Sequence, residues 1–306
     1  MTAPVRQLGY RLFGRRLDYL LHLRPAEWPI VAVHAATGAV LAVSLPGLEQ
    51  FDLRQVLLGI GLWVVCLNGG TLAVNSAFDH DEGDIAYLRA PPDPPPHLFT
   101  FGTALMVFGL GAAAALPALY WQAYASCMGL SILYSVPPIR LKSVAGIDWF
   151  INMWGFGTLT PFAGWAASGL PISRAGEIVL LGFCPLFAGL YPLTQLYQAD
   201  EDRRRGDRTL ASVLGPRASL VLSFWAVALA FGLFGWAGLE AGWMDQPDGL
   251  LRLGLLLAGA VTWGLVLLPW LKHATQLTPR SHQRRMYAAL VAWAVTDGAV
   301  IYGFGR

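Results

Sequence analysis

Charged side chains are scarce in this sequence of 306 residues. Aspartate, glutamate, lysine and arginine together make up 13% of it, whereas 55% is hydrophobic. A soluble domain of this size ordinarily carries about twice that charged fraction. The shortage is uneven, because residues 101–119, 179–197 and 250–271 hold almost no charge. Each stretch reaches the roughly 20 residues that cross a hydrocarbon layer as a helix. These features argue against a soluble domain and favour a membrane protein.

Strict alternation of polar and apolar residues is also missing. A lipid environment permits only helices and closed barrels, and the continuous apolar runs exclude a barrel. We therefore predict a single domain over residues 1–306, an all-α polytopic membrane protein built as a bundle of about nine transmembrane helices. The predicted spans are roughly 28–46, 56–78, 98–117, 119–136, 148–169, 176–197, 218–239, 250–271 and 286–304.

Cysteine is rare as well. The three cysteines, Cys66, Cys127 and Cys184, each fall inside a predicted span and share no metal-ligand spacing. Buried thiols usually serve packing, so we assign them no function.

A secretory signal is not expected either, because residues 1–24 contain five arginines and no apolar core of the right length. We expect this segment to be an amphipathic helix at the membrane surface, with a flexible basic tail as the alternative for its first ten residues.

Lysine and arginine indicate the orientation of the predicted bundle. Of the 21 basic residues, 17 fall on the side of the N-terminus and 4 on the opposite side. Cytoplasmic loops carry such an excess, so we expect a cytoplasmic N-terminus. The net charge of +2 gives no reason to expect a nucleic-acid partner. The basic side chains are expected to face lipid headgroups or the protein's own carboxylates.

Two acidic segments end predicted spans on the cytoplasmic side. The first runs from Asn75 through Asp79 to Asp84, and the second from Gln198 to Asp207. In each segment an amide and a carboxylate stand four residues apart, namely Asn75 with Asp79 and Gln198 with Asp202. That spacing places both side chains on one helical face. The alternative is that these are solvated loop charges near helix ends, but two segments with the same pattern on one side favour a shared site.

Carboxylates gathered at one membrane depth repel each other unless a cation lies between them. Mg²⁺ takes oxygen ligands and usually binds one or two carboxylates while it shares substrate phosphates. We therefore predict a magnesium site that bridges a diphosphate.

A third loop contains Pro137 and Pro138, followed by Arg140 and Lys142. The prolines favour an extended turn, and the two cations are typical partners of phosphate oxygens, although ordinary positive-inside anchoring would also explain them.

These motifs, in their order and spacing, resemble the UbiA superfamily of intramembrane prenyltransferases. The features that carry the resemblance are nine spans, Asn-x-x-x-Asp after span 2, Tyr-Ser-x-Pro-Pro-x-Arg-x-Lys after span 4, and Asp-Arg-x-x-Gly-x-Arg-Thr after span 6. The resemblance implies a Mg²⁺-dependent enzyme that ionises an isoprenyl diphosphate inside a helical bundle, with its active site capped near the cytoplasmic face. It implies Asp79 and Asp202 as the catalytic metal ligands, and it implies diphosphate binding by Arg24, Arg140, Lys142 and Arg208.

The sequence departs from the family pattern at two positions. Gly83 stands where the family usually has a second aspartate, and Gln198 stands where the second motif usually begins with one. Replacement by nearby acids is one explanation, which would add Asp81, Asp84 and Asp200 to the metal ligands. For the second motif a continuing helix is the other explanation. It would turn Gln198 toward the site as a neutral ligand and Asp200 away, and we favour a continuous helix there.

The resemblance also implies a pocket for an allylic cation and an acceptor. Trp154 and Phe156 in the fifth predicted span are candidates to stabilise the cation through their rings. Asn152 is a candidate to orient the acceptor. The expected partners are an isoprenyl diphosphate, a hydrophobic acceptor of aromatic or lipid type, and membrane lipid. A terpene cyclase with the same ionisation step and a cation or metabolite transporter are the alternatives. Asp297 lies within the last predicted span, away from the expected metals, and is not assigned to the site.

Overall fold

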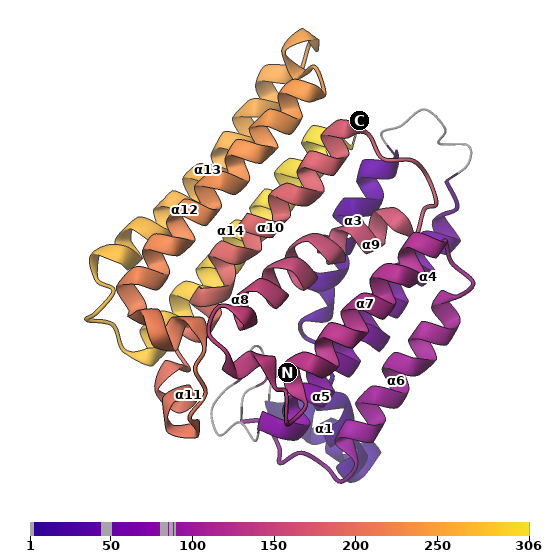
Figure 1. Ribbon diagram of the computed structural model, residues 1–306, viewed down its shortest axis with the longest axis vertical. Helices are drawn as coiled ribbons and strands as arrows, with labels where there is room; N and C mark the ends of the chain where they lie inside the picture. Colours follow the sequence, from indigo (N-terminus) through magenta and orange to yellow (C-terminus); the bar gives the residue numbers. More distant parts are fainter. Residues whose placement is uncertain (1–2, 44–50, 80–84, 86–87, 89, 306) are drawn as a thin grey trace.

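The computed structural model describes residues 3–43, 51–79, 85, 88 and 90–305. The regular secondary structure within them is helical, apart from two isolated bridges. The helices of the bundle run side by side (Figure 1). They are α3 (Trp28–Val43), α4 (Leu53–Gly61), α5 (Gly69–Asp79), α6 (Leu98–Ala113), α7 (Ala118–Ser135), α8 (Ile147–Asn152), α9 (Thr160–Ala166), α10 (Arg174–Gln195), α12 (Leu210–Glu240), α13 (Gly249–Lys272) and α14 (Pro279–Phe304). The all-α prediction is confirmed for the described residues.

Each of the nine predicted spans overlaps one of these helices or a continuous helical run. Five runs are long and apolar enough to cross a membrane, namely Leu53–Asp79, Arg174–Gln195, Leu210–Glu240, Gly249–Lys272 and Pro279–Phe304. Two shorter apolar helices occupy Trp28–Ala42 and Leu98–Ala113. The protein is therefore an integral membrane protein with several spans. The count of nine stays a prediction.

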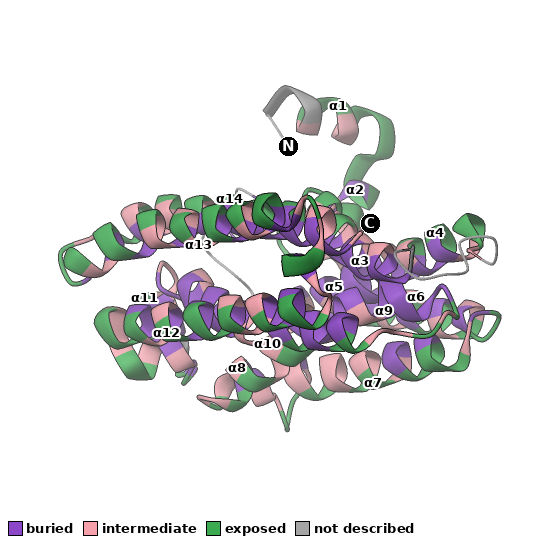
Figure 2. Cartoon of the chain, turned by 90° about the horizontal axis from the view of Figure 1, so that it is seen from above, coloured by how far each residue is buried: buried purple, intermediate pink, exposed green. Residues whose placement is uncertain are grey.

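The N-terminal segment forms helices in its described part rather than an irregular tail. Helix α1 (Ala3–Phe13) is followed by a 3-10 turn, η1 (Gly14–Arg16), and by α2 (Leu17–His22). Figure 2 shows α1 standing away from the body of the bundle. Its Leu8, Leu12 and Phe13 side chains are exposed, which agrees with the expected amphipathic helix. Its place at a membrane surface remains a prediction.

One end of the molecule collects the segments that carry the polar motifs. In Figure 1 the N-terminus and the short helix α11 (Ala199–Arg205) lie toward the lower end. The C-terminus and the connection between α12 and α13 lie toward the upper end.

Several helices begin with a side-chain hydroxyl that accepts a hydrogen bond from a backbone N–H of the first turn. Ser173 does so for α10, Thr209 for α12 and Thr278 for α14. Such caps satisfy amides that the first helical turn leaves free.

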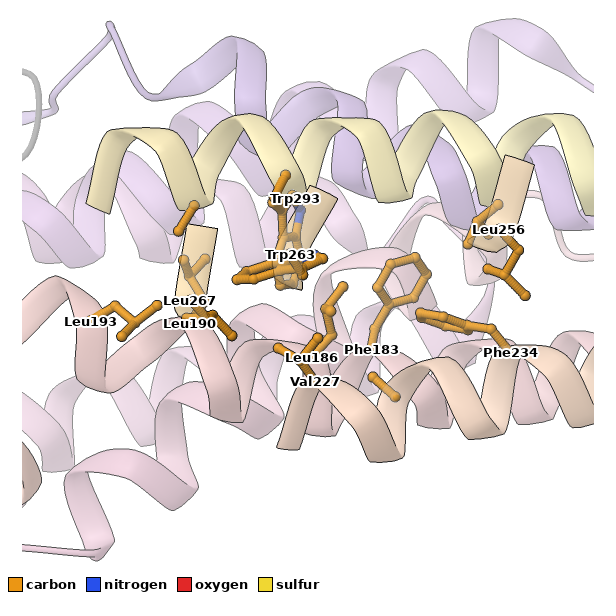
Figure 3. Close-up of a cluster of buried hydrophobic side chains, with 14 of the residues drawn as sticks. Phe183, Leu186, Leu190, Leu193, Val227, Phe234, Leu256, Trp263, Leu267 and Trp293 are labelled. Carbon is orange, nitrogen blue, oxygen red and sulfur yellow. The ribbon is translucent and has the colours of Figure 1, made fainter. Parts of the chain in front are cut away.

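The largest buried apolar cluster joins the C-terminal helices to α10. Figure 3 shows side chains from α10, α12, α13 and α14 in contact with one another, among them Phe183, Leu186, Leu190, Val227, Phe234, Trp263, Leu267 and Trp293. The opposite faces of α12 and α13 are exposed and apolar, with Trp225, Leu250 and Leu265 among their residues. Lipid would cover such faces, so this half of the bundle buries one stripe of each helix and leaves the other to the bilayer.

Close backbone contact joins α3 to α9. A Cβ on Gly38 would overlap the carbonyl oxygen of Pro161, and a Cβ on Gly164 would overlap the carbonyl oxygen of Ala35. Small residues at such crossings let transmembrane helices approach closely. Because neither glycine can be replaced without moving a backbone, these two positions fix the distance between α3 and α9.

Two helical runs contain π-helical segments, η3 (Leu62–Asn68) between α4 and α5 and η5 (Met153–Leu159) between α8 and α9. The indole Nε1 of Trp63 in η3 donates a hydrogen bond to the Thr160 hydroxyl at the end of η5, over 3.2 Å. A π-helical turn shifts the direction of all following side chains, and such turns occur frequently at functional sites. Both segments contribute walls to the cavity described below.

His34 and Asp297 form a buried polar contact in the bundle interior. The His34 Nδ1 lies 3.1 Å from the Asp297 Oδ1, and the His34 Nε2 lies 3.2 Å from the carbonyl oxygen of Gly157 in η5. A carbonyl oxygen can only accept a hydrogen bond, so the His34 Nε2 is the donor in its contact with Gly157. The contact ties α3, α14 and η5 together. Asp297 thus has a structural partner in this interior.

We predict that His34→Leu and Asp297→Leu each lower the stability of the protein by about 3–5 kcal/mol, because each leaves a buried polar partner without its counterpart. The double variant should be less destabilised than the sum of the two. Thermal unfolding of the purified protein in detergent measures this. Single variants that unfold like the wild type would show that the contact is not formed.

Candidate active site

A cavity of about 260 Å³ lies between the helices of the N-terminal half and α10. Side chains of η3, α5, α7, η5 and α10 line it, together with residues from the loop that follows α7 and from α11. At one end its wall carries Asp79, Lys142 and Asp202, whereas Trp63, Leu67 and Phe156 form apolar wall elsewhere. The cavity therefore combines a charged end with an apolar interior.

Asp79 ends α5 and is the acceptor at the centre of the charged end. Its carboxylate pairs with the ammonium group of Lys142, and its Oδ1 lies 3.3 Å from the Arg140 Nη2. The Asp79 and Lys142 side chains are both buried. Buried charges persist only when they are paired. The acidic motif after α5 and the basic loop after α7 are thus held together by ion pairs.

Arg140 connects the same loop to the segment that follows α11. Its guanidinium donates through Nη1 to the Asp207 Oδ1 and through Nη2, over 3.3 Å, to the Asp207 Oδ2. A parallel bridge pairs Val144 with Arg208 next to this contact. The planar fork of an arginine suits a carboxylate in this bidentate way. All three polar motifs therefore meet at one end of the molecule.

Asp202 lines the cavity from α11 and is buried. Its Oδ2 accepts a hydrogen bond from the Thr209 hydroxyl at 3.2 Å, and its backbone N–H donates to the Gln198 carbonyl at 2.9 Å. Gln198 also lines the cavity. Asp200, in contrast, is exposed, and its Oδ1 pairs with Arg203 at 2.7 Å. The amide and the second carboxylate thus face the cavity, and the acid between them faces away.

The expected continuous helix at the second motif is wrong. Helix α10 ends at Gln195, a turn follows, and α11 begins at Ala199. Gln198 and Asp202 nevertheless line the same cavity, because the turn returns the chain to helical conformation within one residue of Gln198. Gln198 and Asp202 thus face the cavity and Asp200 faces away, as expected for a continuing helix, although the helix itself is interrupted.

Arg24 lines the cavity from the connection between α2 and α3. Its Nη2 lies 3.5 Å from the Ser76 hydroxyl and its Nη1 lies 3.8 Å from the Glu27 Oε1. Burial raises the pKa of the Glu27 carboxyl to about 7, and the nearby Arg24 guanidinium opposes that rise. Glu27 therefore balances the arginine only in part near neutral pH. A second cation is available at the cavity beside Lys142.

Asp148 holds together helix ends next to the cavity, a role that was not predicted from the sequence. The side chain is fully buried. Its Oδ2 accepts from the Gln195 amide and from the Leu210 backbone N–H, each at 2.9 Å, and its Oδ1 accepts from the Gly146 N–H at 2.8 Å. The carboxylate thus joins the starts of α8 and α12 to the end of α10. A lone aspartate carries no spacing that could have revealed this role.

The wall beyond the charged end is aromatic and amide-bearing. Phe156 stacks on Phe187 with ring centroids 5.4 Å apart, and the Tyr134 and Tyr191 hydroxyls lie 2.8 Å apart. Asn152 lines the cavity, and its amide donates to the Asp148 carbonyl at 2.8 Å. Phe156, Tyr134 and Tyr191 all border the cavity. An allylic cation in this space would meet ring faces and tyrosine oxygens.

Several residues expected at the site lie elsewhere. Trp154 is exposed and does not line the cavity, because Asn152 and Phe156, two residues away on either side, face inward and a helix turns residues two apart toward opposite sides. Arg208 is also exposed and outside the lining. Asn75 does line it, with its amide 3.5 Å from the Ser135 hydroxyl. Asp81 and Asp84 lie outside the described residues.

The donor set suits a hard cation that also binds its substrate. Within the described residues no group of three histidine, cysteine, aspartate or glutamate side chains could enclose a metal. Asp79, Asp202, Asn75 and Gln198 instead offer two carboxylates and two amide oxygens around one cavity. Mg²⁺ commonly takes one or two carboxylates and completes its shell with water and substrate phosphate. The residues present fit such an ion.

Comparisons with known proteins agree with this geometry. The model of the UbiA prenyltransferase family matches residues 31–286. A lycopene elongase/hydratase from Haloferax volcanii is 30% identical over 263 residues, which cover 83% of this chain and 80% of that protein. A chloroplastic chlorophyll synthase from Oryza sativa is 27% identical over 165 residues, which cover 45% of this chain and 43% of that protein.

Solved structures show the same fold. A UbiA homologue from Archaeoglobus fulgidus, determined with DMAPP and Mg²⁺ bound, superposes with a TM-score of 0.70 at 20% identity, covering 93% of this chain and 99% of that one. A digeranylgeranylglyceryl phosphate synthase superposes with a TM-score of 0.67 at 16% identity and covers 94% and 97% of the two chains. At these identities the likeness concerns the fold.

The positions of Gln198 and Asp200 give a direct prediction. Gln198→Asp adds a carboxylate to the cavity wall and should tighten Mg²⁺ binding, whereas Asp200→Asn removes an exposed charge and should change it little. Isothermal titration of Mg²⁺ in the presence of an isoprenyl diphosphate compares the two variants with the wild type. The opposite outcome, an inert Gln198→Asp and an inactive Asp200→Asn, would mean that Asp200 is the ligand.

Proposed function

This chain belongs to the UbiA prenyltransferase family, and we propose that it transfers an isoprenyl group from an isoprenyl diphosphate to a hydrophobic acceptor inside the membrane. One observation supports this most strongly. A single cavity carries Asp79, Lys142 and Asp202 at one end and continues between apolar and aromatic side chains. A molecule with a charged head and a hydrocarbon tail matches both parts of that cavity.

In the proposed reaction, Lys142, Arg24 and Arg140 bind the diphosphate oxygens. Lys142 and Arg24 line the cavity, and Arg140 reaches Asp79 next to them. Asp79 and Asp207 already hold the Lys142 and Arg140 side chains at this end. Cations that are oriented before the ligand arrives lose little rotamer freedom when they bind it. The ion pairs thus support a role in positioning the diphosphate.

Asp79 and Asp202, with the Asn75 and Gln198 amides, would hold Mg²⁺ at the same end. The ion supplies a positive charge that stabilises the departing diphosphate. The C1–O bond of the donor would then break, with its electron pair going to the diphosphate. The acceptor's electrons would form the new bond to C1, and the acceptor would release a proton to solvent. The dry aromatic wall around Phe156 and Tyr191 would limit attack by water on the allylic cation.

The acceptor is proposed as an aromatic or lipid molecule. The name of the Haloferax volcanii relative makes lycopene, a polyene, the first acceptor to assay. The cyclase alternative shares the ionisation step. It differs in that a double bond of the donor itself, and not a separate acceptor, supplies the electrons of the new carbon–carbon bond. The transporter alternative loses its support, because the family match covers most of the chain.

Replacing either proposed metal ligand should abolish the ionisation step. We expect Asp79→Ala and Asp202→Ala each to lower diphosphate release well below a tenth of wild type at saturating Mg²⁺. A tenfold loss corresponds to only about 1.4 kcal/mol of barrier, less than a direct metal ligand should contribute. Release of diphosphate from purified protein measures the effect. Asp245→Ala, an exposed acid in the turn between α12 and α13, serves as the control.

We also propose that the charged end of the cavity faces the cytoplasm. The motive is the excess of 17 to 4 basic residues on the side of the N-terminus. Single cysteines placed at Asp200 and Arg284, which are both exposed, in a chain without its three native cysteines, should react with an impermeant thiol reagent from the same side. Labelling of the two positions from opposite sides would refute this topology.

A further inference from the structure

Asn68 is a polar residue of the cavity wall that the proposed reaction does not use. It ends the π-helical segment η3 and is 4% exposed. It borders the cavity together with Asn75 and Asp79 of the following helix. Among the described residues, neither its amide nitrogen nor its amide oxygen has a hydrogen-bond partner. A buried amide without partners is costly to the folded protein, so a ligand for it is expected.

The depth of Asn68 separates it from the charged end. Helix α5 runs from Gly69 to Asp79. At about 1.5 Å per residue, Asn68 lies roughly 16 Å from Asp79 along the helix axis. Trp63, Leu67 and Leu72 give the surrounding wall apolar surface. A diphosphate held at Asp79 and Lys142 would not reach this position, but the far end of a long isoprenyl chain would.

Other polar side chains of this part of the wall are already paired. The Thr71 hydroxyl donates to the Ser131 hydroxyl at 2.8 Å, and the Ser131 hydroxyl lies 2.8 Å from the Cys127 carbonyl. Trp63 donates to Thr160 at 3.2 Å. In contrast to these paired side chains, Asn68 has no partner for either amide atom within the described part of the chain, so its whole amide can bind a ligand.

The two unpaired atoms define the chemistry of that ligand. An amide offers donors on nitrogen and an acceptor on oxygen, so it is complementary to water and not to a hydrocarbon chain. A bound water can be displaced without loss only by a group that reproduces its hydrogen bonds. A methyl-rich isoprenyl tail cannot do so.

We propose that Asn68 selects against long isoprenyl donors, because its amide binds a water molecule that a short chain leaves in place and a long chain must displace. The inference rests on the proposed function for the nature of the donor. It assigns a specificity role to a residue that lies outside both acidic motifs. One amide, in a wall whose Thr71, Ser131 and Trp63 side chains are already paired, would then determine which chain lengths bind.

The test measures binding of unreactive donors, so that it does not depend on turnover. Dissociation constants of dimethylallyl and geranylgeranyl S-thiolodiphosphate, in which sulfur replaces the bridging oxygen, are determined by calorimetry with Mg²⁺. Asn68→Leu keeps the number of side-chain heavy atoms and removes the amide. It should tighten binding of the geranylgeranyl analogue about tenfold, the scale of one unsatisfied buried polar group. Binding of the dimethylallyl analogue should stay within about twofold.

Ser131→Ala, which removes a paired hydroxyl from the same wall, is the matched control and should leave the ratio of the two constants unchanged. Asn68→Ala provides a second variant that should shift the ratio in the same direction as Asn68→Leu. An unchanged ratio, an equal shift for both analogues, or the same shift in Ser131→Ala would overturn the inference. Failure of the wild type to release diphosphate from any reactive donor would instead count against the proposed function, and the two failures are thereby distinguishable.

Discussion

Charge is costly inside a helical bundle surrounded by lipid, and at the end of this cavity opposite charges are held against one another. Asp79 binds Lys142 and Arg140, and Arg140 also binds Asp207. These contacts join the end of α5, the loop after α7 and the chain after α11. Three segments that are far apart in sequence are thereby brought together, and they form the charged end of the cavity. Removing one member would leave a buried charge without its partner.

The scaffold around this network is made of contacts that satisfy polar groups internally, as a membrane interior requires. Asp148 accepts hydrogen bonds from α8, α10 and the start of α12. His34 joins Asp297 to the carbonyl of Gly157. Asn68 departs from this rule, since its amide has no partner within the described residues. Other buried side chains of the described residues, such as His22 and Ser219, also lack partners, but Asn68 combines an entirely unpaired amide with a place in the cavity wall, where a ligand can reach it.

Much of this architecture could be predicted from the sequence, because lipid imposes a strong pattern. Long apolar runs coincide with the helices, and breaks such as Leu170-Pro171 fall between them. The spacing of Asn75 with Asp79 placed both at one cavity, since α5 is regular there. The expectation for Trp154 was wrong. It lies two residues from Asn152 and two from Phe156, which both line the cavity, and a helix turns residues two apart toward roughly opposite sides. The spacing alone could therefore have excluded Trp154 from the cavity.

Residues that act through distant partners were equally hidden. Asp148 reaches the site through its contact with Gln195, whereas Asp207 lines the cavity and also binds Arg140. No local motif indicates either pairing. The break after Gln195 was missed as well, because the acidic run that follows has ordinary helix-forming residues. The sequence therefore predicted which segments meet, whereas the partners within the site required the three-dimensional arrangement.

We propose that Asp202 and the paired charges of Asp79 and Lys142, which line one cavity, bind a magnesium ion and an isoprenyl diphosphate together. Calorimetric titration of the purified protein with dimethylallyl S-thiolodiphosphate, with and without Mg²⁺, tests it most directly. If both ligands share one site, each raises the affinity for the other by the same factor. The account predicts binding at least about tenfold tighter with Mg²⁺ than without it, a coupling of roughly 1.4 kcal/mol. Equal affinity in the presence and absence of Mg²⁺ would contradict it.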